Sequence, residues 1–253
     1  DNENLNQTAY TQPAMVTAEL AIVEAMKEAG IFCPDAAAGL SLGEYSALAA
    51  AGVLAPMDAV RAVKSRGRLM EEAVPAGEGA MSAVLAMKPE TVEEILGDLG
   101  EVWIANDNCP GQLVISGRTE AVERAEEALR RAGAKRVIRL KVSGPFHSPL
   151  LKKAGEALGA VLEPIPAARP EIPYAANVTG AYVREKEPVK ELLIRQVSGQ
   201  VRWRQSILMM LEDGVDTFVE IGPGKTLSAF VRKISREAVV RNLETWEDLL
   251  QWT

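Results

Sequence analysis

An excess of positive charge, a set of cysteines and a long apolar run are all missing from this sequence of 253 residues. The formal net charge is −7, which argues against nucleic-acid binding because phosphate backbones attract basic proteins. The longest uncharged apolar stretch, residues 45–57, is shorter than the ~18 residues that a membrane-spanning helix needs. We therefore expect neither nucleic acid nor a membrane among the partners of this protein.

Cysteine is represented by two residues, Cys33 and Cys109, which provide neither a disulfide framework nor metal-binding spacing. A lone cysteine near a histidine can act as a nucleophile, but a buried, inert thiol is the commoner role. Cysteine usage of this kind, without a visible signal peptide, is typical of the reducing cytoplasm. With 47% hydrophobic and 25% charged residues, the composition is that of an ordinary globular protein.

Residues 1–78 predict the first part of a large α/β domain. Apolar side chains recur at helical spacing over residues 11–30, and residues 31–40 form an apolar segment typical of a buried strand. The alanine-rich segment 43–54 predicts a second helix, and residues 56–74 predict a third. The expected order is helix, strand, sharp turn, helix.

Residues 79–142 predict a compact domain inserted into the larger one. The pattern alternates strands and helices in the order βαββαβ, which is that of a split βαβ, ferredoxin-like unit. Its expected elements are strands over 80–87, 102–107, 112–117 and 135–142, and helices over 89–100 and 119–133.

Residues 143–253 predict the second part of the large α/β domain. A helix is expected over 150–162, and the proline-rich segment 163–180 is expected to be extended or looped. Residues 190–214 are helical in pattern with a break near Gly199, and residues 216–234 predict a strand, a glycine turn and a helix.

The stretch 39–43, Gly-Leu-Ser-Leu-Gly, fits the G-x-S-x-G pattern that sets a serine on a sharp strand-to-helix turn. Ser41 is therefore a candidate nucleophile, and a serine in a plain tight turn is the alternative. The N–H of Leu42, at the start of the expected helix, is placed to donate to an oxyanion.

The chain contains a single histidine, His147. A serine nucleophile needs a general base of near-neutral pKa, and histidine is the usual choice. His147 lies in a Gly-Pro and Ser-rich turn between an expected strand and an expected helix, where active-site residues of α/β proteins tend to lie. A purely structural histidine is the alternative.

Five motifs occur in the order typical of one enzyme family. They read GLSLGEYSALAAAGVL (39–54), SRGRLMEEAVP (65–75), NDNCPGQLVISG (106–117), SGPFHSPLL (143–151) and FVEIGPGKTL (218–227). Together they resemble the malonyl-CoA:acyl carrier protein transacylase family, which is related to the acyltransferase domains of polyketide synthases. The resemblance extends from residue 11 to about residue 236.

The resemblance implies an α/β-hydrolase-like large domain with a ferredoxin-like insertion. It implies a cytoplasmic acyltransferase of fatty-acid biosynthesis that moves malonyl from CoA to the phosphopantetheine thiol of acyl carrier protein. Ser41 would be the nucleophile and His147 the base. We expect no cofactor, no metal and a monomeric protein.

Five further site residues are implied by the matching positions. Arg66 would pair with the malonyl carboxylate, since a guanidinium binds a planar carboxylate bidentately, whereas a solvated helix arginine is the alternative. The backbone carbonyl of Gln196 would orient His147, and Gln12 would lie near the acyl pocket. Phe146 would narrow that pocket. Asn108 would lie near the cleft, with a turn residue as the alternative.

Two features depart from the family pattern. Leu40 stands where the family usually has a histidine, which removes a polar group beside the acyl pocket. Family members also open with a strand and a G-Q-G turn whose glutamine supplies a second oxyanion N–H. Nothing before Asp1 provides these, so we expect an α/β sheet that lacks its N-terminal strand.

Two other functions compete with transacylation. A serine esterase would let water release the acyl group, but it needs no carboxylate clamp such as Arg66 beside the nucleophile. A weakly active or non-catalytic remnant that binds the carrier protein is the second rival, because one donor of the oxyanion hole is expected to be missing. Loss of one such donor costs on the order of 10²–10³ in rate.

Overall fold

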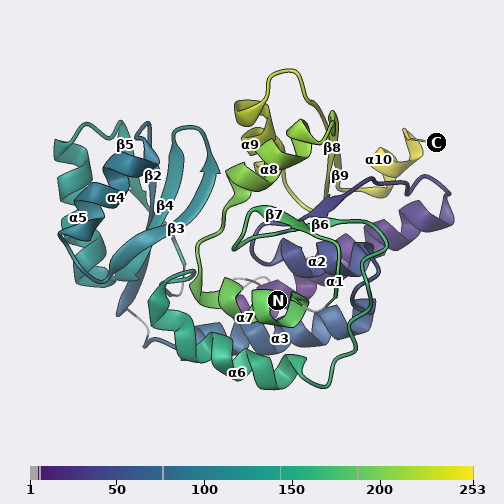
Figure 1. The fold of residues 1–253 in the computed structure, drawn as a ribbon, viewed down its shortest axis with the longest axis horizontal. Coiled ribbons are helices and arrows are strands. Elements are labelled where there is room, and N and C mark those ends of the chain that lie inside the picture. Colours follow the sequence, from purple (N-terminus) through teal and green to yellow (C-terminus); the bar gives the residue numbers. More distant parts are fainter. Residues whose placement is uncertain (1–4, 6, 76, 143, 187, 253) are drawn as a thin grey trace.

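The computed structural model describes residues 5, 7–75, 77–142, 144–186 and 188–252. Figure 1 shows two lobes, with the smaller one in teal formed by β2–β5, α4 and α5. The mixed α/β fold expected from the sequence is confirmed. In the described part of the chain, no helix is both long enough and apolar enough to cross a membrane.

The larger lobe opens with α1 (Thr8–Glu28), β1 (Ala37–Ala38), α2 (Gly43–Ala50) and α3 (Pro56–Glu72). Helix α3 begins with proline at its first position, where a missing N–H costs nothing. The sequence prediction of a buried strand over residues 31–40 was too long. Only Ala37 and Ala38 pair, both half-buried, because their partner strand β6 (Tyr174–Ala176) is itself only three residues long.

The chain returns to the larger lobe after residue 143. Its elements there are the short 3₁₀ helix η2 (Pro149–Leu151), α6 (Lys152–Leu162), β6 (Tyr174–Ala176), β7 (Ala181–Val183), α7 (Val189–Ser198), α8 (Trp203–Glu212), β8 (Thr217–Ile221), α9 (Thr226–Ile234), β9 (Val239–Leu243) and α10 (Trp246–Leu250). The predicted break near Gly199 separates α7 from α8. The proline-rich segment, expected to be extended or looped, contains the short strand β6.

The smaller lobe follows the predicted order of strands and helices. It consists of β2 (Gly79–Leu85), α4 (Pro89–Gly97), β3 (Val102–Cys109), β4 (Gln112–Arg118), α5 (Thr119–Arg131) and β5 (Arg136–Arg139). Its strands form one antiparallel sheet in the order β3-β4-β2-β5. Apolar residues of the sheet pack against α4 and α5, so this lobe has a core of its own.

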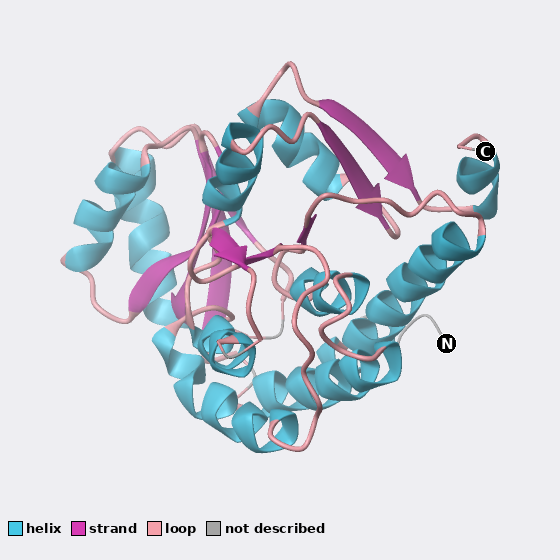
Figure 2. Cartoon of the chain, turned by 45° about the vertical axis from the view of Figure 1, so that its right-hand side comes forward, coloured by secondary structure: helices cyan, strands magenta, loops and turns pink. Residues whose placement is uncertain are grey.

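The described strands of the larger lobe form two short sheets. In one, β1 pairs in parallel with β6 and β6 pairs with β7, and in the other β8 pairs in parallel with β9. Figure 2 shows β8 and β9 as a pair apart from the strands of the smaller lobe. A cavity of about 420 Å³ lies between β1 and β8, and its mainly apolar lining comes from residues 31–39, β8 and α9 as well as from α1, α2 and α8.

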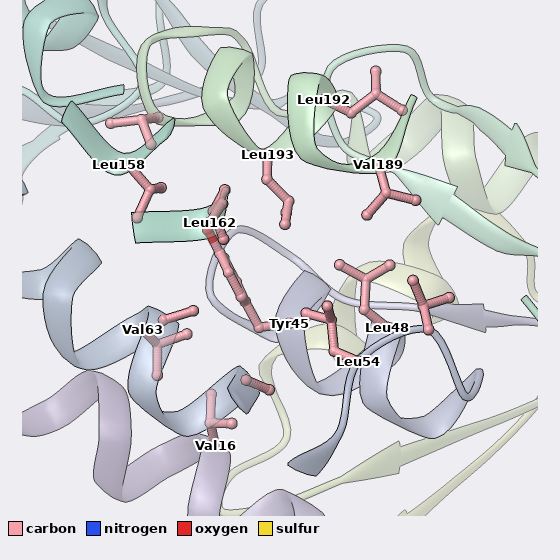
Figure 3. Close-up of a cluster of buried hydrophobic side chains, with 14 of the residues drawn as sticks. Val16, Tyr45, Leu48, Leu54, Val63, Leu158, Leu162, Val189, Leu192 and Leu193 are labelled. Carbon is pink, nitrogen blue, oxygen red and sulfur yellow. The ribbon is translucent and has the colours of Figure 1, made fainter. Parts of the chain in front are cut away.

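The core of the larger lobe lies where its helices meet. Figure 3 shows Val16 of α1, Tyr45 of α2 and Val63 of α3 facing Leu162 of α6 and Leu193 of α7. These side chains are 0–1% exposed. Their burial stabilises the lobe and fixes the helices that carry the polar residues described below.

Close contact between α1 and α3 depends on Gly67. A Cβ atom at this position would lie 2.8 Å from the carbonyl oxygen of Thr8. Real Cβ atoms do not approach backbone that closely, so a larger residue would push the two helices apart. The glycine therefore brings the start of α1, including Gln12, up to Arg66 on α3.

A backbone bridge joins the two lobes beside β3. The N–H of Val201 donates to the carbonyl of Ala105 at 2.8 Å, and the N–H of Asp107 donates to the carbonyl of Val201 at 2.9 Å. The Asp107 carboxylate also accepts from Arg204 at 2.7 Å and from Gln205 at 2.8 Å. These contacts hold one end of β3 against the segment between α7 and α8.

Candidate active site

Ser41 lies on a sharp turn between β1 and α2. Its φ is 52°, which places a non-glycine residue in the left-handed region. Gly39 makes the turn possible, because a Cβ atom there would lie 1.9 Å from the carbonyl oxygen of Gly43. Gly43 meets no such obstacle and instead lines the cavity between β1 and β8. The local geometry is therefore the strand-turn-helix arrangement expected from the motif.

His147 lies next to Ser41 although 106 residues separate them in the sequence. Its φ is 57°, so the second member of the pair also has a left-handed backbone. Its Nδ1 lies 2.9 Å from the carbonyl oxygen of Gln196, and a carbonyl can only accept, so Nδ1 carries the proton. Nε2 is then the acceptor for the Ser41 hydroxyl at 2.7 Å.

The imidazole of His147 is held in its neutral form. Burial lowers its pKa from 6.5 to about 4, and the nearby positive charge of Arg66 contributes in the same direction. The hydrogen bond to the Gln196 carbonyl opposes this shift but is the smaller effect. At neutral pH the imidazole is therefore unprotonated and able to accept a proton from Ser41.

Arg66 is a buried arginine, 1% exposed, whose guanidinium reaches Ser41. Nη2 donates to Ser41 Oγ at 3.0 Å and to Gln196 Oε1 at 3.0 Å, while Nη1 donates to Gln12 Oε1 at 2.8 Å. The alternative of a solvated helix arginine is wrong for this residue, whereas Arg68 on the same helix does have a side chain that is 67% exposed.

The charge of Arg66 has no hydrogen-bonded counter-ion among the described residues, because Ser41, Gln12 and Gln196 are all neutral. Its Nε is buried without a hydrogen-bond partner in the same part of the chain. An unpaired buried cation is costly to the folded protein. Such an arrangement is suited to binding an anion beside Ser41.

Gln196 contacts more of the site than the sequence analysis predicted. The expected contact of its backbone carbonyl with His147 is present. Its side chain in addition donates from Nε2 to the Ser41 carbonyl at 2.8 Å and to Glu44 Oε2 at 2.8 Å. One residue of α7 thus binds the groups that position the nucleophile, the base and the guanidinium.

Sequence reasoning missed Glu44 and Asn177. Glu44 is fully buried in the first turn of α2, and burial raises the pKa of its carboxyl to about 7 against the lowering effect of hydrogen bonds from Gln196 and Asn177. A carboxylate next to G-x-S-x-G in an otherwise alanine-rich helix was the signal available. Asn177 follows β6 and had no signal, because its proximity to Ser41 depends on strand pairing.

The other expected site residues are distributed around this centre. Leu42 is the residue before α2, and no described residue accepts a hydrogen bond from its N–H. Phe146 is half-buried against Met81, Ala105 and Val114 of the smaller lobe. Asn108 is buried within β3, so its alternative as a turn residue is wrong, and its Oδ1 has no hydrogen-bond partner in the described residues.

Comparison with known proteins establishes the class. A family model described as an acyl transferase domain matches residues 1–247, so the chain belongs to the acyl transferase family. A malonyl CoA-acyl carrier protein transacylase from Bacillus subtilis (strain 168) is 49% identical over 240 residues, covering 93% of this chain and 75% of the relative. The chain thus belongs to the malonyl CoA-acyl carrier protein transacylases within that class.

Solved structures agree with this assignment. An acyl carrier protein S-malonyltransferase from Vibrio cholerae matches with a TM-score of 0.95 at 40% identity, covering 99% of this chain and 83% of the other. A malonyl-transacylase in complex with a type II PKS acyl-carrier protein matches with a TM-score of 0.96 at 39% identity, covering 99% and 82%.

Proposed function

We infer that this protein transfers malonyl from malonyl-CoA to the phosphopantetheine thiol of an acyl carrier protein, as the names of its relatives indicate. The observation that carries the inference is the buried Arg66 guanidinium, which touches Ser41 Oγ and has neutral hydrogen-bond partners in the described residues. Malonyl ends in a carboxylate, which is the group that such a cation would pair with.

In the first half-reaction, we propose that Ser41 Oγ attacks the thioester carbonyl carbon of malonyl-CoA while its proton moves to Nε2 of His147. The N–H of Leu42 donates to the oxyanion of the tetrahedral intermediate. When the carbon–sulfur bond breaks, His147 returns the proton to the departing CoA thiolate. The products are free CoA and a malonyl ester on Ser41.

The second half-reaction runs the same steps with the carrier protein. His147 takes the proton of the phosphopantetheine thiol, and the sulfur attacks the ester carbonyl of malonyl-Ser41. Collapse of the intermediate breaks the bond between the carbonyl carbon and Oγ, and His147 reprotonates Ser41. The neutral imidazole, with Nδ1 bound to the Gln196 carbonyl, is suited to both directions.

Four side chains are proposed to shape the acyl pocket. Arg66 binds the malonyl carboxylate, and Gln12 supports Arg66 through the hydrogen bond at 2.8 Å. Phe146 excludes a methyl branch next to the carboxylate. Asn108 lines the cleft from β3, with its unpartnered Oδ1 available to accept a hydrogen bond from the substrate.

We also propose the finer description of the fold. Residues 1–78 and 143–253 form an α/β-hydrolase-like domain, and residues 79–142 form the ferredoxin-like insertion. The antiparallel sheet order β3-β4-β2-β5 supports the insertion. The monomeric state and the cytoplasmic location of the enzyme stay predictions.

Intact mass spectrometry after incubation with malonyl-CoA tests the proposed function. We expect one malonyl adduct on Ser41 that holo acyl carrier protein removes and water does not. The Ser41→Ala variant should fold and remain unmodified, because it lacks the only proposed nucleophile. An adduct lost at the same rate without carrier protein would identify an esterase, and no adduct on the wild-type protein would contradict the proposal.

A further inference from the structure

Asn177 lies against the Ser41 turn and touches neither His147 nor Arg66 through any described hydrogen bond. It follows β6, and the parallel pairing of Ala38 with Ala175 brings the ends of β1 and β6 together. The carboxamide of Asn177 therefore faces the peptide groups that flank the nucleophile. The residue is 1% exposed, so its side chain is out of reach of solvent.

Both ends of the carboxamide are used. Oδ1 accepts from the N–H of Ser41 at 2.5 Å, and Nδ2 donates to the carbonyl of Gly39 at 2.7 Å. The backbone of Asn177 is fixed as well, because its N–H donates to Glu44 Oε2 at 3.2 Å and its carbonyl accepts from the N–H of Arg202 at 2.8 Å. The side chain thus binds the turn on both sides of Leu40, and the backbone that carries it is itself held by hydrogen bonds.

The conformation of the Ser41 turn requires contacts of this kind. A serine with φ 52° is in a sparsely populated backbone conformation, which persists only where surrounding contacts enforce it. The hydrogen bonds to Gly39 and Ser41 are the contacts that join this turn to β6. A small backbone rotation at Ser41 would move Oγ away from both His147 Nε2 and Arg66 Nη2.

We propose that Asn177 is a positioning residue for the nucleophile. Its carboxamide holds Ser41 in the left-handed conformation that places Oγ between His147 and Arg66. By occupying the N–H of Ser41, it also leaves the N–H of Leu42 as the donor for the oxyanion. The role as a whole rests on the proposed acyl transfer, whereas the positioning of Oγ holds for any reaction at Ser41.

Three variants separate positioning from general stability. Asn177→Ala removes the acceptor and the donor, and Asn177→Asp keeps the acceptor but sets a carboxylate oxygen against the Gly39 carbonyl. The matched control is Asn242→Ala, because Asn242 also uses both ends of its carboxamide, toward Ser228 and Glu220, but on the β8–β9 side of the lobe.

Steady-state kinetics with malonyl-CoA and holo carrier protein give the first measurement. We expect Asn177→Ala to lower kcat at least tenfold with KM within about twofold, because the chemistry is disturbed and substrate binding is not. Asn242→Ala should stay within about twofold of wild type in kcat. Equal effects of the two alanine variants, at equal folded fractions by circular dichroism, would overturn the proposal.

The pH profile of Asn177→Asp gives the second measurement and decides the matter if Asn177→Ala does not fold. A protonated aspartic acid regains a donor for the Gly39 carbonyl, whereas the ionised form does not. The ratio of variant to wild-type kcat should therefore rise as pH falls from 8 to 5. A ratio that is flat and close to one across this range would contradict the positioning role.

A fluorophosphonate probe distinguishes failure of this proposal from failure of the proposed function. Such a reagent phosphonylates any activated serine: a bond forms between Oγ and phosphorus, fluoride leaves, and the serine proton passes through His147 to solvent. If wild type reacts with the probe but not with malonyl-CoA, the proposed function fails while Asn177 can still be judged. Wild-type rates in Asn177→Ala would then overturn its positioning role.

Discussion

The two lobes bury their acidic side chains in opposite ways. In the smaller lobe, Glu126 accepts hydrogen bonds from Ser82 at 2.5 Å and from Arg139 at 2.7 Å. Burial raises the pKa of Glu126, but these contacts outweigh it and hold the pKa below its ordinary value. In the larger lobe, Glu44 has one oxygen without a partner among the described residues, and burial raises its pKa to about 7.

The difference separates a cluster that stabilises the fold from the one to which we assign the proposed chemistry. Arg139 is directly paired with Glu126, whereas Arg66 makes no ion pair with Glu44 in the described part of the chain: its charge acts on that carboxyl from a distance, and Gln196 hydrogen-bonds to both side chains. A directly paired guanidinium would be less available to a substrate carboxylate. The larger lobe therefore carries a buried charge without a hydrogen-bonded counter-ion among the described residues, which the smaller lobe does not need for its packing.

Among the variants of the larger lobe, removal of the imidazole at position 147 should have the largest effect on the acylation rate. His147→Ala should slow acylation of Ser41 by roughly 10²–10⁴, the usual contribution of a general base. The measurement is a single-turnover reaction with malonyl-CoA, quenched and followed by intact mass. Because His147 is the one histidine of the chain, an unchanged rate would rule out the Ser-His pair altogether.

Replacement of the unpaired cation should cost activity but not stability. Arg66→Met removes a buried charge, which favours the folded state, but leaves the Oε1 atoms of Gln12 and Gln196 without their donor, so the unfolding free energy should change by no more than about 2 kcal/mol. Urea unfolding measures this, with Arg68→Met as the exposed control on the same helix. A loss of several kcal/mol in Arg66→Met would show that the guanidinium holds the fold together.

The matching change in the smaller lobe, Glu126→Gln, should lower the stability of the protein but not its activity. Glu126→Gln weakens the contacts with Arg139 and Ser82, so we expect a loss of about 1–3 kcal/mol in unfolding free energy. Acylation of Ser41 should remain within about twofold of wild type. Since the pKa of Glu126 is lowered in the folded state, its stabilising effect is present above the unfolded pKa of 4.5 and disappears at acid pH.

That pH dependence supplies the control for Glu126→Gln. The stability difference between wild type and this variant should shrink as pH falls through the lowered pKa. A variant that instead lost acylation at full stability would break the distinction between the two clusters.

The smallest expected signal is the titration of the single histidine by NMR. The imidazole of His147 should titrate near 4, with Nδ1 protonated above that pH. The folded protein then binds fewer protons than the unfolded chain between about 4 and 6.5, so this group adds stability as pH rises through that window. A pKa near 6.5 would show that His147 is neither buried nor affected by Arg66.

Local patterns predicted most of the fold. Helical periodicity located α3 and α5 close to their observed bounds, and alternating strands and helices gave the order of the smaller lobe. The prediction was least accurate for the segment that precedes Ser41. Apolar composition over residues 31–40 predicted a long strand, but only two residues pair, because pairing depends on β6 and not on composition.

The site, like the fold, was predicted where the signal is local in the sequence and missed where it is not. Ser41 and His147 were found from a turn motif and a unique residue, both of which are visible in the sequence. The side-chain contacts of Gln196, Glu44 and Asn177 were not, because each depends on elements more than 130 residues apart that meet only after folding. Burial of a polar side chain has no periodic signature of its own.

Donor selectivity tests the central claim most directly. Malonyl-, methylmalonyl- and acetyl-CoA should be compared as acyl donors for wild type and Arg66→Ala, each by the rate of Ser41 acylation. Wild type should prefer malonyl over both others, and Arg66→Ala should lose at least about tenfold on malonyl, since ~1.4 kcal/mol is a factor of ten. Acetyl-CoA, which has no terminal carboxylate, should lose much less or gain. An equal loss on malonyl and acetyl donors would mean that Arg66 is structural, and the assignment of a malonyl substrate to this site would fall.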